Sequence, residues 1–206
     1  MGSIDTEIVS LTQIVDDSIV FDARINTLNQ WATEYTKEDI ANELNILSRN
    51  GESRNAILRV IDKPTRLEFL TSIALKQNFV DLDVRPNYHV DDEGLPTFTA
   101  SGGVADIECY DTDCNSLVEV TLMCARNQAT NEMPAITRHL QEAIEKEPNI
   151  THFSMLIASS IHIDTQYMAA FSKHQYNVDI LTFTITEFLN KIKLNSKIIE
   201  IVNDIR

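Results

Sequence analysis

Residues 102–124 read GGVADIECYDTDCNSLVEVTLMC, and apolar and polar side chains alternate in two parts of this stretch. The first alternation runs from Val104 to Tyr110, and the second runs from Leu117 to Cys124. Between them, residues 111–115 are types that favour tight turns. The pattern predicts two neighbouring β-strands joined by a short turn.

Each predicted strand carries acidic side chains on one face, because successive side chains of a strand point to opposite sides. The alternation places Asp106 and Glu108 together on the first strand, and Glu119 together with Thr121 on the second. The apolar residues fall on the opposite faces: Ala105, Ile107, Cys109, Val118, Val120 and Leu122. The sequence therefore predicts that Asp106 and Glu119 lie side by side on adjacent strands.

This pair of acids allows two interpretations. A carboxylate in an apolar strand is costly to bury unless it is paired or binds a cation. Hard oxygen ligands suit Mg²⁺, which takes one or two protein carboxylates together with waters and substrate phosphate, and this predicts metal-assisted phosphodiester hydrolysis. In the alternative, Asp106 hydrogen-bonds a turn and Glu119 faces water on an edge strand. Periodicity alone does not separate the two.

The N-terminal part of the chain is predicted to be helical. Thr36 with Asp39 resembles a capping box, and the helix that follows is expected to end at Asn50-Gly51. Apolar residues recur at helical spacing through this part: Ile8, Leu11, Ile14, Val15, Leu28, Trp31, Ile40, Leu44 and Leu47.

The remaining elements alternate between helix and strand. Thr65 is predicted to cap a helix that reaches Asn78, and Val80–Val90 to form one strand that ends in a turn. After residue 124, the patterns predict helix, strand, helix and strand at about residues 134–147, 152–159, 164–174 and 178–184, with helices to the end. This order predicts an α/β fold, with a mixed central sheet flanked by helices. We expect an N-terminal helical region, residues 1–62, and a core, residues 63–206.

The composition is that of a globular domain with an acidic surface. A chain of 206 residues with 43% hydrophobic side chains can bury a core without disulfides. The cysteines Cys109, Cys114 and Cys124 lack zinc-site spacing and are expected to be reduced. No apolar run suits a secretory signal or a membrane span, so a cytoplasmic location is expected. The net charge of −14 opposes phosphate binding: either a partner supplies positive charge, or the acids simply solvate the surface.

The run Gly102-Gly103-Val104-Ala105-Asp106, followed after twelve residues by Glu119-Val120-Thr121, resembles a nuclease signature. The signature is that of PD-(D/E)xK nucleases, in its AlwI-like type IIS restriction and nicking endonuclease form. Family spacing extends the match to Glu68 upstream and to Glu132 and His139 downstream. The resemblance covers about residues 63–185 and includes the order of elements. It implies a restriction-endonuclease-like fold whose catalytic core, residues 63–206, cleaves DNA with Mg²⁺ or Mn²⁺.

The resemblance also implies a set of metal ligands. Asp106 and Glu119 would bind the ion, with the carbonyl of Val120 as a third protein oxygen. Glu68 would hold a metal-bound water or a second ion. A second interpretation of Glu68 stays open, because Thr65 and Glu68 are spaced as a capping box, in which the glutamate accepts from the threonine amide.

Thr121 is the point at which the sequence departs from the family. Many relatives have a lysine there that orients the nucleophile and neutralises transition-state charge, which a threonine hydroxyl cannot supply. Glu132 and His139 are candidates for part of this task, because His139 can donate to a phosphate oxygen or transfer a proton near neutral pH. In the alternative, both lie on a solvated helix face. Arg126 and Arg138 are further candidates for phosphate contacts.

Type IIS enzymes separate recognition from cleavage, and the chain contains no zinc finger or basic helix for reading bases. The resemblance, the length and the charge favour the catalytic small subunit of a heterodimeric type IIS site-specific deoxyribonuclease. Such a subunit cuts one strand of double-stranded DNA, binds DNA weakly alone, and relies on a larger DNA-recognising nuclease subunit. The alternatives are a catalytically inactive nuclease-like interaction or regulatory subunit, which the missing lysine favours, and a structure-specific nuclease of repair or recombination.

Overall fold

A five-stranded sheet forms the centre of the protein in the computed structural model, which describes residues 13, 19–21 and 23–203. Its strands lie in the order β1-β4-β5-β6-β7. The first three are antiparallel neighbours, and β5, β6 and β7 are parallel. The strand bounds are Asp83–Pro86 (β1), Ile107–Tyr110 (β4), Cys114–Thr121 (β5), Thr151–Ala158 (β6) and Ile180–Thr184 (β7). The mixed central sheet confirms the predicted fold class.

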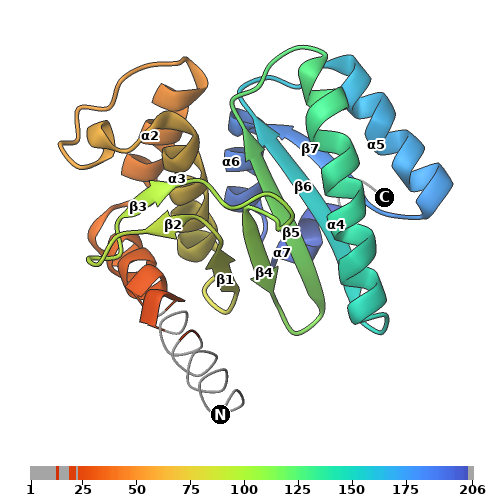
Figure 1. The fold of residues 1–206 in the computed structure, drawn as a ribbon, viewed down its shortest axis with the longest axis horizontal. Coiled ribbons are helices and arrows are strands. Elements are labelled where there is room, and N and C mark those ends of the chain that lie inside the picture. Colours follow the sequence, from red (N-terminus) through yellow and green to blue (C-terminus); the bar gives the residue numbers. More distant parts are fainter. Residues whose placement is uncertain (1–12, 14–18, 22, 204–206) are drawn as a thin grey trace, which may run out of the picture.

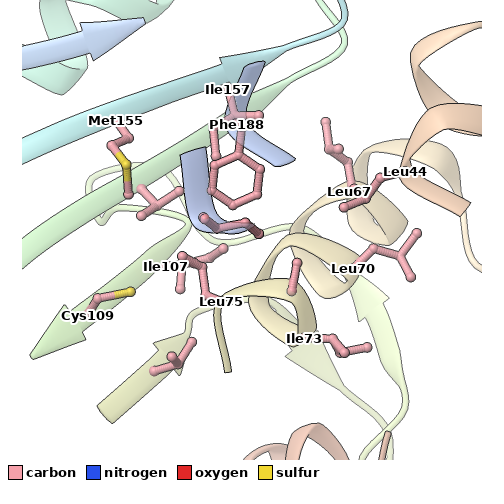
Figure 2. Close-up of a cluster of buried hydrophobic side chains, with 14 of the residues drawn as sticks. Leu44, Leu67, Leu70, Ile73, Leu75, Ile107, Cys109, Met155, Ile157 and Phe188 are labelled. Carbon is pink, nitrogen blue, oxygen red and sulfur yellow. The ribbon is translucent and has the colours of Figure 1, made fainter. Parts of the chain in front are cut away.

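Helices cover both faces of the sheet (Figure 1). One face packs against α3 (Lys63–Asn78), α6 (Ile185–Leu194) and α7 (Ile198–Asn203), with α2 (Lys37–Ser48) behind α3. The other face packs against α4 (Met133–Lys146) and α5 (Ile163–Tyr176). Figure 2 shows the larger of the two apolar cores, where side chains of α3 and α6 meet the sheet: Leu67, Leu70, Ile107, Ile157 and Phe188.

The N-terminal helices share this larger core. Residues 23–34 are helical, and Leu28 and Trp31 are buried with Leu44 in the same cluster as the sheet. The capping box of Thr36 and Asp39 is present in both directions, which confirms the predicted start of α2. The predicted helical positions Ile8, Leu11, Ile14 and Val15 lie outside the described residues, and the division of the chain at residues 62 and 63 stays a prediction.

The predicted start of α3 was wrong. Asp62 is the N-cap, and its carboxylate accepts from the Thr65 N–H at 3.3 Å. The helix therefore begins at Lys63, ahead of the predicted cap. Pro64 falls in the first turn, where the missing N–H of proline costs no helical hydrogen bond.

The predicted single strand from Val80 to Val90 is divided in two. After β1 ends at Pro86, β2 (His89–Val90) pairs with β3 (Pro96–Phe98) in a separate two-stranded sheet. Asn87 fixes the break, because its N–H donates to the Asp106 carbonyl at 2.8 Å and its side chain donates to the Ala105 carbonyl at 2.9 Å. These bonds connect the chain after β1 to the segment that enters β4.

One edge of the sheet collects the ends of several elements, at the top of Figure 1. The strands β5, β6 and β7 end there, and α4, α5 and α6 begin there after them. The antiparallel strand β4 begins at this edge. In α/β proteins, functional sites form at the carboxyl ends of parallel strands. Among the described helices, none has the length and apolar character needed to cross a membrane.

Candidate active site

Glu119 lies on the central strand β5, near the edge where the parallel strands end. Its side chain points away from Val118 and Val120, which belong to the larger core, as the alternation predicted. Glu119 and Thr121 are each 8% exposed. Because β5 has neighbours on both sides and Glu119 is buried, the interpretation of Glu119 as a water-facing residue on an edge strand is excluded.

Asp106 directly precedes β4, whose first residue, Ile107, pairs with Val118. Asp106 therefore lies beside Glu119, and the two are joined through the main chain. The Val120 N–H donates to Asp106 Oδ2 at 2.7 Å, and the Asp106 N–H donates to Glu119 Oε2 at 3.3 Å. The predicted face of Ala105 was wrong: alternation begins only at Ile107, and Ala105 packs in the smaller core against α4.

Glu68 reaches the same place from the second turn of α3. It is 3% exposed, and its Oε2 accepts from the Ala100 N–H at 3.0 Å. The capping-box interpretation is excluded, because Asp62 and not Glu68 contacts Thr65. Burial raises the pKa of Glu68 to about 8; the Ala100 N–H opposes this rise and the negative charge of Glu119 adds to it.

Asp106 has the same kind of electrostatic environment. Desolvation raises the pKa of Asp106 well above its usual range, and the charges of Glu119 and Glu68 raise it further, while the Val120 N–H opposes them. Among the described residues, no lysine or arginine forms an ion pair with Glu68, Asp106 or Glu119. Three carboxyl groups thus share one site without a lysine or arginine partner among the described residues.

Thr121 connects a fourth acid to this group. Its hydroxyl donates to Glu132 Oε1 at 2.9 Å and accepts from the Met123 N–H at 3.0 Å. Glu132 ends a π-helical turn, η2 (Gln128–Glu132), that leads into α4. Burial raises the pKa of Glu132, the Thr121 hydroxyl lowers it and the charge of Glu119 raises it. Glu68, Asp106, Glu119 and Glu132 are called the carboxylate cluster below.

His139 projects from α4 onto the carboxylate cluster. It is 9% exposed, which excludes the solvated helix face for this residue, and its Nδ1 lies 3.0 Å from Glu119 Oε1. Its Nε2 is buried and has no hydrogen-bond partner among the described residues. His139 also lines a cavity of about 210 Å³ between α4 and the strands β4 and β5. The ring is therefore placed to orient Glu119.

Gln128 holds the π-helical turn in place, and sequence reasoning missed it. Its fully buried side chain donates to the carbonyls of Met123 (2.8 Å) and Ser160 (2.6 Å). The same side chain accepts from the His162 N–H (3.0 Å) and the Thr165 hydroxyl (3.3 Å). The sequence around Gln128 is polar and gives no sign that this side chain is buried. Its partners lie after β5 and around the start of α5, and these segments meet only in the folded chain.

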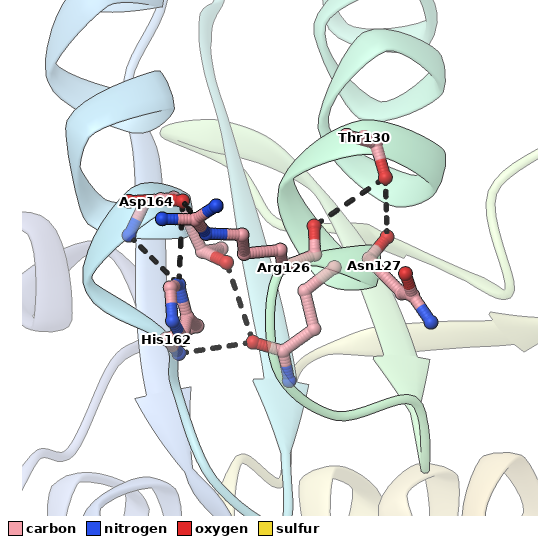
Figure 3. Close-up of polar contacts among 7 residues, drawn as sticks. Arg126, Asn127, Thr130, His162 and Asp164 are labelled. Carbon is pink, nitrogen blue, oxygen red and sulfur yellow. Dashed lines mark hydrogen bonds and ion pairs between the residues drawn. The ribbon is translucent and has the colours of Figure 1, made fainter.

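The two arginines predicted near the site are both on the surface. Figure 3 shows Arg126 beside Asp164, and its Nε lies 3.2 Å from the Asp164 carboxylate. The Arg126 side chain is nevertheless 81% exposed. Arg138 is exposed on α4. Neither arginine forms an ion pair with the carboxylate cluster among the described residues.

The donor set fits a hard divalent cation. Within the described part of the chain, no three His, Cys, Asp or Glu side chains are arranged as a complete metal site. The expected ligand set needs only two side chains, Asp106 and Glu119, and one carbonyl, that of Val120. This small set matches Mg²⁺, which keeps several waters and shares its coordination with substrate phosphate. A cation bound there would offset the unfavourable burial that raises the pKa values of Glu68 and Asp106.

Comparison with protein families matches residues 3–190 to the AlwI restriction endonuclease model. The chain belongs to the AlwI restriction endonuclease family. The match confirms the resemblance found in the sequence. It identifies the chain as a type II site-specific nuclease. The search of curated proteins gave no significant match.

Solved structures of restriction endonucleases have the same fold as this AlwI family member. The small subunit of the heterodimeric restriction endonuclease R.BspD6I (R.BspD6I2) matches with a TM-score of 0.66 and 21% identity, over 82% of this chain and 86% of that one. The restriction endonuclease FokI matches with a TM-score of 0.53 and 12% identity, over 83% of this chain. The match covers 33% of FokI, so this chain spans about a third of that protein.

Proposed function

We propose that the chain is the catalytic small subunit of a heterodimeric type IIS restriction endonuclease and hydrolyses one DNA strand with Mg²⁺. The observation that carries the proposal is the carboxylate cluster. Glu68, Asp106 and Glu119 come from a helix, a strand entry and a central strand. Glu68 and Glu119 are buried and Asp106 is half-buried, and none of the three pairs with a lysine or arginine among the described residues. Burying acids without cationic partners lowers the stability of a protein, so their presence favours a functional role.

Asp106, Glu119 and the Val120 carbonyl would hold the ion, and Glu68 would hold a water on it or a second ion. The bound ion supplies the positive charge that DNA hydrolysis needs and that the chain lacks at this site. The Val120 N–H fixes Asp106, so the carboxylate that faces the substrate is oriented by the neighbouring strand. Such support from rigid elements keeps a catalytic geometry precise.

Glu132 and His139 support the reaction from the α4 side of the site. His139 holds Glu119 through Nδ1, so its contribution is to position a ligand, and the ring is too buried to act as an exposed phosphate donor. Thr121 directs Glu132 toward the cluster and brings no charge of its own. The charge that a lysine supplies in many relatives would therefore come from the ion and from groups that arrive with the DNA complex.

The need for a partner subunit is inferred from the net charge of this chain and from its similarity in length to a known small subunit. The net charge of −14 is unfavourable for holding DNA without help. The small subunit of heterodimeric R.BspD6I is matched over 86% of its length, which supports a subunit of the same kind. A larger subunit that recognises the sequence and holds the duplex would present the scissile phosphate at high effective concentration. One site in this chain then cuts one strand, and the partner cuts the other.

A supercoiled plasmid that carries the recognition site tests the proposal. It is incubated in Mg²⁺ with this chain, with the candidate large subunit, or with both. We expect negligible cutting by this chain alone and double-strand cleavage by the pair. With Glu119→Gln in this chain, the pair should only nick, and the nicks should fall on one strand when sequenced.

The same assay separates the competing functions. The absence of a lysine at Thr121 favours a catalytically inactive, regulatory subunit, for which Glu119→Gln would leave double-strand cleavage unchanged. Robust double-strand cleavage by the isolated chain would indicate a self-sufficient nuclease. Cleavage that depends on branched or damaged DNA, and not on the recognition site, would indicate a repair or recombination enzyme.

A further inference from the structure

The connection between α2 and α3 is a basic segment in an acidic chain. Residues 49–63 contain four of the seventeen Lys and Arg residues of the protein: Arg49, Arg54, Arg59 and Lys63. The same segment contains two acids, Glu52 and Asp62. We call this segment the arginine loop.

Both acids of the arginine loop already have partners. Lys63 Nζ lies 2.8 Å from the Glu52 carboxylate, and Asp62 caps the start of α3. By contrast, Arg49, Arg54 and Arg59 are exposed, and none of them forms an ion pair or a side-chain hydrogen bond with another described residue. Three full positive charges therefore face solvent from one short segment.

The arginine loop is an ordered piece of structure. Leu58 and Ile61 are buried in the larger core, and the buried Arg66 side chain donates to the Ile61 carbonyl at 2.8 Å. The Asn55 side chain accepts from the N–H groups of Ile57 and Leu58. Since the backbone is anchored in this way, little backbone entropy would be lost when the arginines bind a ligand.

The position of the loop relates it to the carboxylate cluster. α3 begins directly after the loop, and Glu68 lies six residues beyond its N-cap Asp62, which is about 9 Å along the helix axis. In Figure 1 the loop is the orange segment at the upper left, at the same end of the molecule as the end of β5 and the start of α4. The arginine loop and the carboxylate cluster are therefore connected through the first two turns of α3.

We propose that Arg49, Arg54 and Arg59 bind backbone phosphates of the DNA duplex whose strand enters the carboxylate cluster. This inference rests on the proposed cleavage of DNA at that cluster. Arginine suits phosphate oxygens because its planar guanidinium donates two hydrogen bonds at once and stays charged. Such contacts carry no sequence information and fix the position of the duplex. The chain is therefore acidic overall and locally basic where the substrate passes.

A salt titration of DNA binding tests the proposal. The full chain is titrated against a fluorescein-labelled duplex in EDTA, and anisotropy gives the binding constant at several low salt concentrations. Each phosphate contact contributes about 0.9 to the slope of log K against log salt. We expect Arg49→Gln/Arg54→Gln/Arg59→Gln to lower the slope by about 2 to 3 and the affinity at least tenfold.

A charge-matched control separates local contact from net charge. Lys146, Lys173 and Lys193 lie in the last turns of α4, α5 and α6, at the opposite edge of the sheet. Their triple change to glutamine removes the same charge and should leave the slope unchanged. Equal losses in the two triple variants, or no loss in the arginine variant, would overturn the proposal; the latter would indicate a surface for the partner protein.

A second measurement applies even if binding is weak. Phenylglyoxal modifies free arginines, and mass spectrometry reports the rate at each position. An excess of duplex should slow the modification of Arg49, Arg54 and Arg59. Equal rates with and without DNA would overturn the proposal. Because neither assay contains a metal ion, both report on the loop independently of whether the carboxylate cluster cleaves DNA.

Discussion

His139 shows how one buried side chain can organise an acidic site. Its Nδ1 contacts Glu119 Oε1, while the other oxygen of Glu119 accepts from the Asp106 N–H. The carboxylate is thereby held at both oxygens, by a helix on one side and a strand entry on the other. A ligand held in this way keeps its orientation when a metal ion or a substrate binds.

We predict that His139→Ala slows single-turnover cleavage by the assembled enzyme at least tenfold, about 1.4 kcal/mol of transition-state stabilisation. Glu119 would lose one of its two orienting contacts. His139→Gln, whose amide can still donate to Glu119, should retain more activity. If both variants cleave at the wild-type rate, the contact has no catalytic consequence. A higher Mg²⁺ requirement in His139→Ala would support ligand positioning over a simple loss of stability.

The two acids at the entry to β4 allow a matched comparison. Asp106 belongs to the carboxylate cluster, while Glu108 lies two residues further on and accepts from the Tyr110 hydroxyl at 3.0 Å. We predict that Asp106→Asn abolishes cleavage of one strand, because the proposed metal site loses a ligand, and that Glu108→Gln leaves cleavage unchanged. Both variants should still fold cooperatively and bind the partner, which thermal melting and a binding assay check. Near-normal cleavage by Asp106→Asn would contradict the metal-site assignment.

The π-helical turn before α4 carries Glu132, the acid that bonds the hydroxyl of Thr121. An α-helical start would place the residues before Met133 differently, and π-helical turns are frequent at functional sites. The turn brings Glu132 within 2.9 Å of the Thr121 hydroxyl. It is held by Gln128, which links the end of β5 and the start of α5 to the turn.

Gln128→Ala is expected to destabilise the protein by about 2 kcal/mol or more, because buried backbone groups would lose their partners and each costs about 1–3 kcal/mol. Cleavage should also slow, since Glu132 would no longer be fixed. Urea unfolding measures the first effect. Gln128→Glu is the control: it can still accept from the His162 N–H but cannot donate to the two carbonyls, so it should also be destabilised. A wild-type unfolding midpoint in both variants would argue against this role.

For the whole molecule, the buried acids make stability depend on pH. Glu68 releases its proton near its ordinary pKa of 4.5 when the chain is unfolded, and at about 8 when it is folded. Between these values the folded state holds a proton that the unfolded state has released. The contribution of Glu68 to stability therefore falls as pH rises from about 4.5 to about 8.

We predict that Glu68→Gln raises the melting temperature of the metal-free protein, and raises it more at pH 8 than at pH 5. Burying the ionised carboxylate of Glu68 costs free energy, and this cost is largest above the pKa that Glu68 has in the folded protein. The glutamine side chain carries no charge, so the variant avoids this cost. A gain of about 2 °C or more at pH 8 is expected, on the scale of about 1 kcal/mol for a chain of this size. Scanning calorimetry in EDTA measures it, and a gain that is equal at both pH values would contradict the assigned cause.

The sequence by itself determined the order of elements outside residues 80–98 and the side-by-side placement of Asp106 and Glu119. Both depend on local rules: the alternation of side chains on a strand and the periodicity of helices. The capping box of Thr36 and the faces of Glu119 and Val120 follow from the same rules, and the structure has them. The family signature was also local, because its residues keep a fixed spacing.

Only the tertiary structure decided the roles of residues for which the local sequence pattern was ambiguous or silent. Asp62 caps α3 in place of the predicted Thr65, and Glu68 makes no capping bond and reaches the Ala100 N–H instead. Gln128 gained its role from partners far apart in sequence. Burial and contacts across elements involve residues that no sequence period connects, so only the folded chain decided which side chains of the carboxylate cluster are buried and which arginines of the loop are unpaired.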